Sequence, residues 1–272
     1  MHATALPDAL ARRIQGCPFP VALAVVTPQL TWAGGDLATV YPWMSVTKLV
    51  TSRIVLRAVE DGLIDLDDPL GPQGSTVEMV LAHASGLGPE GDVQAAPGTR
   101  RIYSNAGYEL LGQLVEQVRG QQFSQLVAGY MEQLGPDAHF EGSPAWGMSS
   151  RLLALATLAS EMLEPRLIDP ALWRLATRPA WPGLPGIVPG YGSFDDDQWG
   201  LGPEIRAHKH PHWTAPDAAP GVYGHFGQSG SFLWVDAEAQ VGACFLSSRR
   251  FGLAHQRLWP DLNAEIQRMF IG

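Results

Sequence analysis

The spacing of apolar residues predicts a helix, two strands and a long helix in the first quarter of the chain. Apolar positions over 5–15 recur at helical spacing, and the continuous valine-rich run over 20–28 has the length of a buried strand. A second strand is expected around 31–32, with a turn at 34–35. Over 45–60 the apolar positions follow one helical face again, so we expect a long helix there.

The middle of the chain is predicted to be helical. Segments with helical spacing, each bounded by Gly, Pro or Ser, cover about 76–83, 106–119, 122–134 and 149–163. The stretch 179–191 is too rich in Pro and Gly for regular structure, so it is predicted to be a loop, with a lid as one interpretation.

Strand patterns return in the last third of the chain. Apolar segments of strand length cover 199–205, 231–237 and 240–248, and an amphipathic helix is expected over 258–270. Strands at both ends of a chain with a helical middle predict an α+β fold. In this fold, an antiparallel sheet of N- and C-terminal strands is flanked by helices and interrupted by a helical insertion.

We expect one domain over residues 1–272. Its α/β part is predicted in about 1–65 and 199–272, and its helical part in about 66–198.

Charge and composition narrow the class of partner. The net charge of -9 and the pI near 5.3 argue against binding to nucleic acid or to an anionic membrane, because both need a clustered basic face. The first residues lack the pattern of a secretion signal, and no apolar run approaches the roughly 18 residues that span a bilayer. We therefore expect a cytoplasmic protein with small-molecule partners, in which Cys17 and Cys244 are free thiols.

Candidate chemistry begins at Ser45 and Lys48, which lie three residues apart at the start of the long predicted helix. This spacing places both side chains on one helical face, where the amine can reach the hydroxyl. A desolvated lysine with a lowered pKa can accept the proton of a serine hydroxyl and so make it a nucleophile. The alternative is a serine that caps the helix, with a solvated lysine one turn later.

The use of basic residues favours the chemical interpretation. Of the 18 basic residues only Lys48 and Lys209 are lysine, and arginine cannot act as a base because its pKa stays above about 12. A lysine therefore stands where a neutral amine is useful.

The segment 41–70, YPWMSVTKLVTSRIVLRAVEDGLIDLDDPL, resembles the nucleophile helix of a known superfamily. Three further segments agree with it: LAHASGLGP at 81–89, PGTRRIYSNAGYELLGQLVE at 97–116 and GHFGQSGSFLWVD at 224–236. In this order they resemble the serine beta-lactamases and penicillin-binding proteins, in the branch of class C enzymes, D-aminopeptidases and esterases. The resemblance implies the beta-lactamase/transpeptidase-like form of the α+β fold.

The resemblance also implies roles for the second motif. Tyr103 would lie beside Ser45 and Lys48, be helped toward the phenolate by the nearby ammonium and relay protons to the leaving group. Asn105 would donate its amide to a substrate carbonyl. The other interpretation of Asn105 is an N-cap for the helix that follows, and both roles can hold together.

The third motif departs from the family pattern. His225 stands where many relatives have lysine; it can donate a hydrogen bond to a substrate carboxylate or to Tyr103, but it is charged only below about pH 6.5. Gly227 would let the strand approach the substrate, with a plain strand bulge as its alternative. The amides of Gln228 and Ser45 would form the oxyanion hole.

Other patterns are assigned structural roles. His208, His210 and His212 alternate as a metal site would prefer, but no adjacent carboxylate or cysteine completes a set, so no metal is expected. The run at 195–197 is interpreted as a solvated turn. His83 is expected to hold a loop. Three tryptophans have two interpretations, as the lining of a substrate cleft or as core or rim packing: Trp181, Trp199 and Trp213.

The predicted function is that of a serine hydrolase that forms an acyl-enzyme at Ser45, most simply a carboxylesterase-type acyl hydrolase without metal or organic cofactor. A beta-lactamase or D-amino-acid-specific peptidase is the second interpretation. The third is a binding or sensor protein that is acylated without turnover. The substrate would be a small-molecule ester, amide or lactam, and the oligomeric state is left open.

Overall fold

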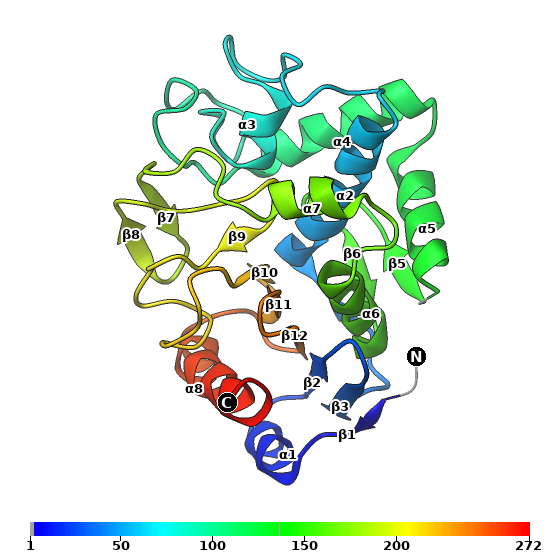
Figure 1. The fold of residues 1–272 in the computed structure, drawn as a ribbon, viewed down its shortest axis with the longest axis vertical. Coiled ribbons are helices and arrows are strands. Elements are labelled where there is room, and N and C mark those ends of the chain that lie inside the picture. Colours follow the sequence, from blue (N-terminus) through cyan, green and yellow to red (C-terminus); the bar gives the residue numbers. More distant parts are fainter. Residues whose placement is uncertain (1–2, 136) are drawn as a thin grey trace.

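In the computed structural model, which describes residues 3–135 and 137–272, a seven-stranded sheet forms the centre of the molecule (Figure 1). In spatial order its strands are β1 (Thr4–Ala5), β3 (Thr31–Gly35), β2 (Val21–Val26), β12 (Val241–Ser247), β11 (Ser231–Asp236), β10 (Tyr223–Gly227) and β9 (Glu204–Ile205). All neighbours are antiparallel except β1 and β3. The N- and C-terminal strands thus share one sheet, which confirms the predicted α+β fold.

Both faces of this sheet are covered. Along β2, Leu23 and Val25 pack into one core with α1 (Asp8–Gln15) and α8 (Leu253–Phe270), which lie beside each other at one end of the molecule (Figure 1). The alternate residues of β2 pack into a second core with α6 (Leu152–Leu163). Because successive side chains of a strand point to opposite faces, burial on both faces accounts for the continuous apolar run.

The remaining helices form a layer beyond the second core (Figure 1). They are the short 3-10 helix η1 (Met44–Val46), α2 (Thr47–Glu60), α3 (Val77–Leu81), α4 (Asn105–Arg119), α5 (Phe123–Leu134) and α7 (Pro170–Ala176). Two small sheets complete the described part: β4 (Tyr41–Pro42) with β6 (Met148–Ser150) and β5 (Ala138–Phe140), and β7 (Gly186–Val188) with β8 (Gly192–Phe194). The helix α2 is buried over most of its length, so its first turn is held rigidly.

Several predicted boundaries were wrong. The predicted turn at Gly34 and Gly35 lies inside β3; Gly35 has φ +89°, and a Cβ atom there would lie 2.2 Å from the carbonyl oxygen of Val21. The predicted strand over 199–205 is reduced to β9, and α8 begins five residues earlier than expected. The loop at 179–191 contains β7, and α7 was not foreseen because its seven residues are too few for a clear helical pattern.

Two further expectations concern the whole chain. Within residues 3–135 and 137–272, none of the helices combines the length and apolar character needed to cross a bilayer. Cys17 and Cys244 are both free, as predicted, although Cys17 is half-buried and only Cys244 is fully buried.

Candidate active site

Ser45 lies in η1, at the junction between the central sheet and α2. The preceding residue, Met44, has φ +49°, a left-handed conformation that is rare for a residue with a side chain. The Oγ atom of Ser231 donates a hydrogen bond of 2.7 Å to the carbonyl oxygen of Trp43 and so ties this turn to β11. A Cβ atom on Gly227 would lie 2.2 Å from the same oxygen. Gly227 pairs in register with Ser231, so the bulge interpretation is wrong, and its lack of a side chain lets β10 approach the turn.

Lys48 is fully buried one helical turn after Ser45. Its Nζ atom donates to Oδ1 of Asn105 at 2.7 Å and to the carbonyl oxygen of Ala145 at 3.0 Å. Burial lowers the pKa of Lys48 well below its ordinary value, which makes the ammonium easier to deprotonate. A neutral amine at this position keeps two N–H groups for these two acceptors and has one lone pair left to accept a proton. The solvated-lysine interpretation is therefore wrong.

The ring of Tyr103 lies against Lys48, with Nζ 4.7 Å from the ring centroid. Burial raises the pKa of Tyr103 above its ordinary value; the Ser45 hydroxyl opposes this rise, and Glu204 adds to it. The expectation of a phenolate is thus wrong, because burial favours the protonated phenol. Its hydroxyl is buried and has no hydrogen-bond partner of normal geometry among residues 3–135 and 137–272.

Asn105 is the first residue of α4, and it is not the N-cap. The N-cap is Ser104, whose hydroxyl accepts the Gly107 N–H at 2.9 Å. Because Ser104 performs the capping, the side chain of Asn105 is free to turn toward the site, where its oxygen accepts from Lys48. Its amide N–H₂ group remains available as a donor.

His225 is buried in β10, and the backbone carbonyl of the next residue orients its ring. Its Nδ1 atom lies 2.7 Å from the carbonyl oxygen of Phe226; a carbonyl only accepts, so Nδ1 carries the proton. Burial, with the nearby Lys48, lowers the pKa of His225 to about 3, which makes it neutral. Its Nε2 atom is therefore an acceptor, and it has no partner in the described part of the chain. The expectation that His225 donates a hydrogen bond is wrong for this neutral tautomer.

These groups meet in a pocket of about 210 Å³. It is lined by Ser45, Tyr103, Asn105, Val188, Pro189, Trp199, Glu204, His225, Phe226 and Gln228. Two backbone N–H groups at the pocket, those of Ser45 and Gln228, donate to no other group in the described ranges, as an oxyanion hole requires. The structure thus brings the predicted site residues together, with Lys48 behind Ser45 and Gly227 at the end of the neighbouring strand.

One buried cluster at this pocket was missed by the sequence reasoning. The Oε1 atom of Glu204 lies 2.7 Å from Nζ of Lys209 and 3.0 Å from Nε2 of His212, and its Oε2 atom accepts from Trp213 at 2.7 Å. Nζ of Lys209 also lies 2.9 Å from Oδ1 of Asp197. Burial acts to raise the pKa of Glu204, but Lys209 and His212 outweigh it and lower that pKa below its usual range.

This cluster corrects two sequence interpretations. The run at 195–197 is not a solvated turn throughout, because Asp197 is buried against Lys209. The three alternating histidines do not converge, since His212 is buried in the cluster while His208 and His210 are exposed. The sequence feature that could have indicated this cluster is Lys209, the second of two lysines in a chain whose other basic residues are arginine.

The remaining candidates have structural positions. Nδ1 of His83 accepts the Ser104 N–H at 3.1 Å, which agrees with the expected loop-holding role. Trp199 lines the pocket, Trp213 is buried in the core, and Trp181 packs half-buried at the helical layer.

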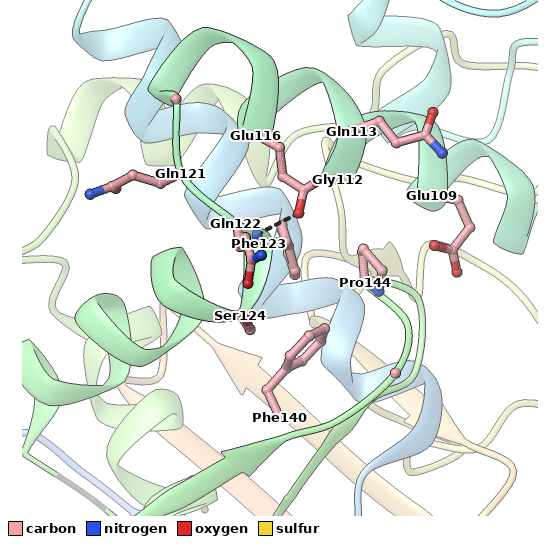
Figure 2. A pocket seen from close by; sticks show the side chains of 12 residues that line it. Glu109, Gly112, Gln113, Glu116, Gln121, Gln122, Phe123, Ser124, Phe140 and Pro144 are labelled. Atoms are coloured by element: carbon pink, nitrogen blue, oxygen red, sulfur yellow. Dashed lines mark hydrogen bonds between the residues drawn. The ribbon is translucent and has the colours of Figure 1, made fainter.

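A larger pocket of about 750 Å³ lies along α4 and does not include Ser45 in its lining (Figure 2). Its wall includes Glu109, which connects it to the site: the Ser143 hydroxyl donates to Glu109 and accepts the Ala145 N–H, and the Ala145 carbonyl binds Lys48. The charge of Glu109 also acts to raise the pKa of Lys48, against the larger effect of burial.

Comparisons with known proteins agree with this geometry. The family model described as Beta-lactamase matches residues 27–134. A beta-lactamase from Mycobacterium bovis is 37% identical, covers 97% of this chain and 100% of its own, and has a TM-score of 0.94. A simvastatin synthase from Aspergillus terreus (16% identity, 96% and 93% coverage, TM-score 0.79) shares the fold. A penicillin-binding protein homologue from Pyrococcus abyssi shares the fold as well; it is 18% identical, covers 96% of this chain and 76% of its own, and has a TM-score of 0.75. No curated protein matches the sequence.

Proposed function

Because the chain belongs to the beta-lactamase family, within the superfamily of serine beta-lactamases and penicillin-binding proteins, we propose that it is a serine hydrolase that forms an acyl-enzyme on Ser45. The observation that carries the proposal is the state of Lys48. Its amine is buried, burial lowers its pKa, and two acceptors bind Nζ. Such an amine has a lone pair ready for a proton one helical turn from a serine hydroxyl.

Acylation then proceeds by proton transfer from Ser45 to Lys48. The serine oxygen attacks the substrate carbonyl carbon, and the backbone N–H groups of Ser45 and Gln228 stabilise the oxyanion that forms. When the tetrahedral intermediate collapses, the carbonyl is restored and the bond to the leaving group breaks.

Tyr103 acts in this scheme as an acid. Its raised pKa keeps the phenol protonated, so it gives its proton to the departing oxygen or nitrogen and regains one from the Lys48 ammonium. Deacylation repeats these steps with water as the nucleophile: the water loses a proton to Lys48, and the acid product leaves Ser45.

A carboxylesterase-type acyl hydrolase is the function that this site supports best. The neutral His225 offers no positive charge to the carboxylate of a beta-lactam or of a D-amino-acid peptide. Beta-lactam hydrolysis is the second candidate, because the relative from Mycobacterium bovis that is 37% identical is described as a beta-lactamase.

The test is a panel of nitrophenyl esters, a chromogenic cephalosporin and D-amino-acid amides. We expect Ser45→Ala to lose at least about 1,000-fold in kcat/KM on every substrate turned over, whereas Ser248→Ala, at an exposed serine, keeps full activity. Full activity of Ser45→Ala would contradict the proposal. Intact mass measurement decides between turnover and a sensor, since a sensor keeps a stable adduct on Ser45 without steady-state release.

A further inference from the structure

The walls of the Ser45 pocket carry no fixed positive charge. Ten residues line it, and neither lysine nor arginine is among them. Six of the ten are apolar or aromatic: Tyr103, Val188, Pro189, Trp199, His225 and Phe226. A substrate group that enters the pocket beside Ser45 therefore meets apolar and aromatic surface together with a few polar groups.

The polar side-chain atom that β10 contributes to the pocket, Nε2 of His225, is a hydrogen-bond acceptor. Nε2 of His225 is buried and unpartnered among the described residues, and its lone pair is fixed there because Nδ1 donates to the Phe226 carbonyl. A carboxylate is acceptor-only and cannot pair with such an atom. A hydroxyl or an amide N–H can.

The charge nearest to this acceptor in the pocket wall is that of Glu204. Its carboxylate is buried, and the amine that neutralises it, Nζ of Lys209, is shared with Asp197. Two carboxylates on one amine leave no spare positive charge to attract an anion. Two buried arginines of this region are bound to backbone carbonyl oxygens: Arg101 to those of Asp197 and Ala82, and Arg206 to that of Ala207.

We propose that this pocket selects uncharged acyl substrates and rejects those with a carboxylate in the acyl group, because His225 binds a neutral hydrogen-bond donor and Glu204 repels an anion. The proposal rests on the acyl-hydrolase function proposed above and names its substrate class.

The test uses two isosteric substrates, the 4-nitrophenyl monoester of adipic acid and the 4-nitrophenyl ester of its primary half-amide. They differ in the far group, which is a carboxylate in the first and an amide with N–H donors in the second. At pH 7.5 we expect kcat/KM of the wild-type protein to be at least about tenfold higher for the half-amide. Equal values, or a preference for the carboxylate, would overturn the inference.

Two variants test the role of His225 directly. In His225→Lys the ratio of the two kcat/KM values is expected to fall about tenfold or to reverse, because the new ammonium binds the carboxylate. His208→Lys makes the same change at an exposed histidine outside the pocket and is expected to leave the ratio unchanged. If His225→Lys does not fold, His225→Gln, which supplies a neutral N–H donor, is expected to narrow the ratio. An unchanged ratio in a folded His225 variant counts against the inference.

The two proposals fail in different ways. If the wild-type protein hydrolyses neither ester, or if Ser45→Ala hydrolyses them as fast as the wild-type protein does, the hydrolase proposal is wrong. The proposed substrate class is then wrong as well. If hydrolysis depends on Ser45 but the carboxylate ester is preferred, only the substrate class is wrong.

Discussion

Nζ of Lys48 lies 2.7 Å from Oδ1 of Asn105, so a hydrogen bond between the buried Lys48 and the half-buried Asn105 joins the first turn of α2 to the first turn of α4. The contact orients the amine without charging it, because an amide oxygen carries no net charge. A second acceptor, the Ala145 carbonyl, is also neutral. Among the described residues no charged partner thus binds Nζ directly, and burial lowers the pKa of Lys48 toward the range in which it can act as a base.

Replacing that neutral oxygen by a charged one tests this arrangement. Asn105→Asp places a carboxylate against the amine, which favours the ammonium and raises the pKa of Lys48. Since the base must be neutral, activity rises with pH through this pKa, and the rising limb of the kcat/KM profile is expected to move to higher pH. Activity at pH 7 should fall by about tenfold or more. A limb that stays in place would show that Lys48 is not the base.

The opposite shift is expected when charge is removed from the larger pocket. Glu109 acts to raise the pKa of Lys48, so Glu109→Gln should lower it and move the rising limb to lower pH. Glu116→Gln is the control, because Glu116 lines the same pocket on the same helix and its oxygen accepts the Phe123 N–H (Figure 2). Equal pH profiles for both variants would contradict a specific link between Glu109 and Lys48.

The close approach of β10 to the nucleophile turn predicts an effect of one methyl group. In Gly227→Ala the new Cβ atom would lie 2.2 Å from the Trp43 carbonyl oxygen, so the turn that carries Ser45 must move. We expect kcat to fall about 100-fold, since small misplacements of reacting groups are costly, and the protein to lose about 1–3 kcal/mol of stability. Gly221→Ala, where the new Cβ meets nothing within 4 Å, should change neither quantity. Kinetics and thermal unfolding of both variants provide the comparison.

The buried ion pair between Arg53 of α2 and Glu161 of α6 should contribute to the stability of the protein and not to catalysis. Arg53 and Glu161 lie 2.7 Å apart with both side chains at 0% exposure, and Arg53 also donates to the Tyr130 hydroxyl. Glu161→Ala leaves a buried guanidinium without its counter-charge and is expected to cost about 3–5 kcal/mol in denaturant unfolding. Arg119→Ala, which breaks a partly exposed pair with Asp61, should cost less than about 1 kcal/mol. Similar losses of unfolding free energy in the two variants would contradict the expected difference between the buried and the partly exposed ion pair.

The local elements of this fold were predictable because their causes are local. Six successive apolar residues predict a buried strand such as β2. The spacing of three between Ser45 and Lys48 predicts that both lie on one face of a helix. The sequence therefore predicted the strands at both ends and the long α2 helix, and five of its candidate site residues line one pocket: Ser45, Tyr103, Asn105, His225 and Gln228. It failed at Gly34 and Gly35, where contact with a neighbouring strand, invisible in the local pattern, keeps two glycines in β3.

By itself, then, the sequence determined the α+β class and the chemical groups available to the site. The protonation of these groups was decided by the tertiary structure alone. Burial lowers the pKa of Lys48, whose Nζ atom is bound by acceptors 57 and 97 residues away in the chain. Tyr103 keeps its proton because it is buried, and Nε2 of His225 is an acceptor because Nδ1 donates to a backbone carbonyl. A pKa depends on burial and on charges brought close by folding, and such distant contacts leave no periodic trace along the chain.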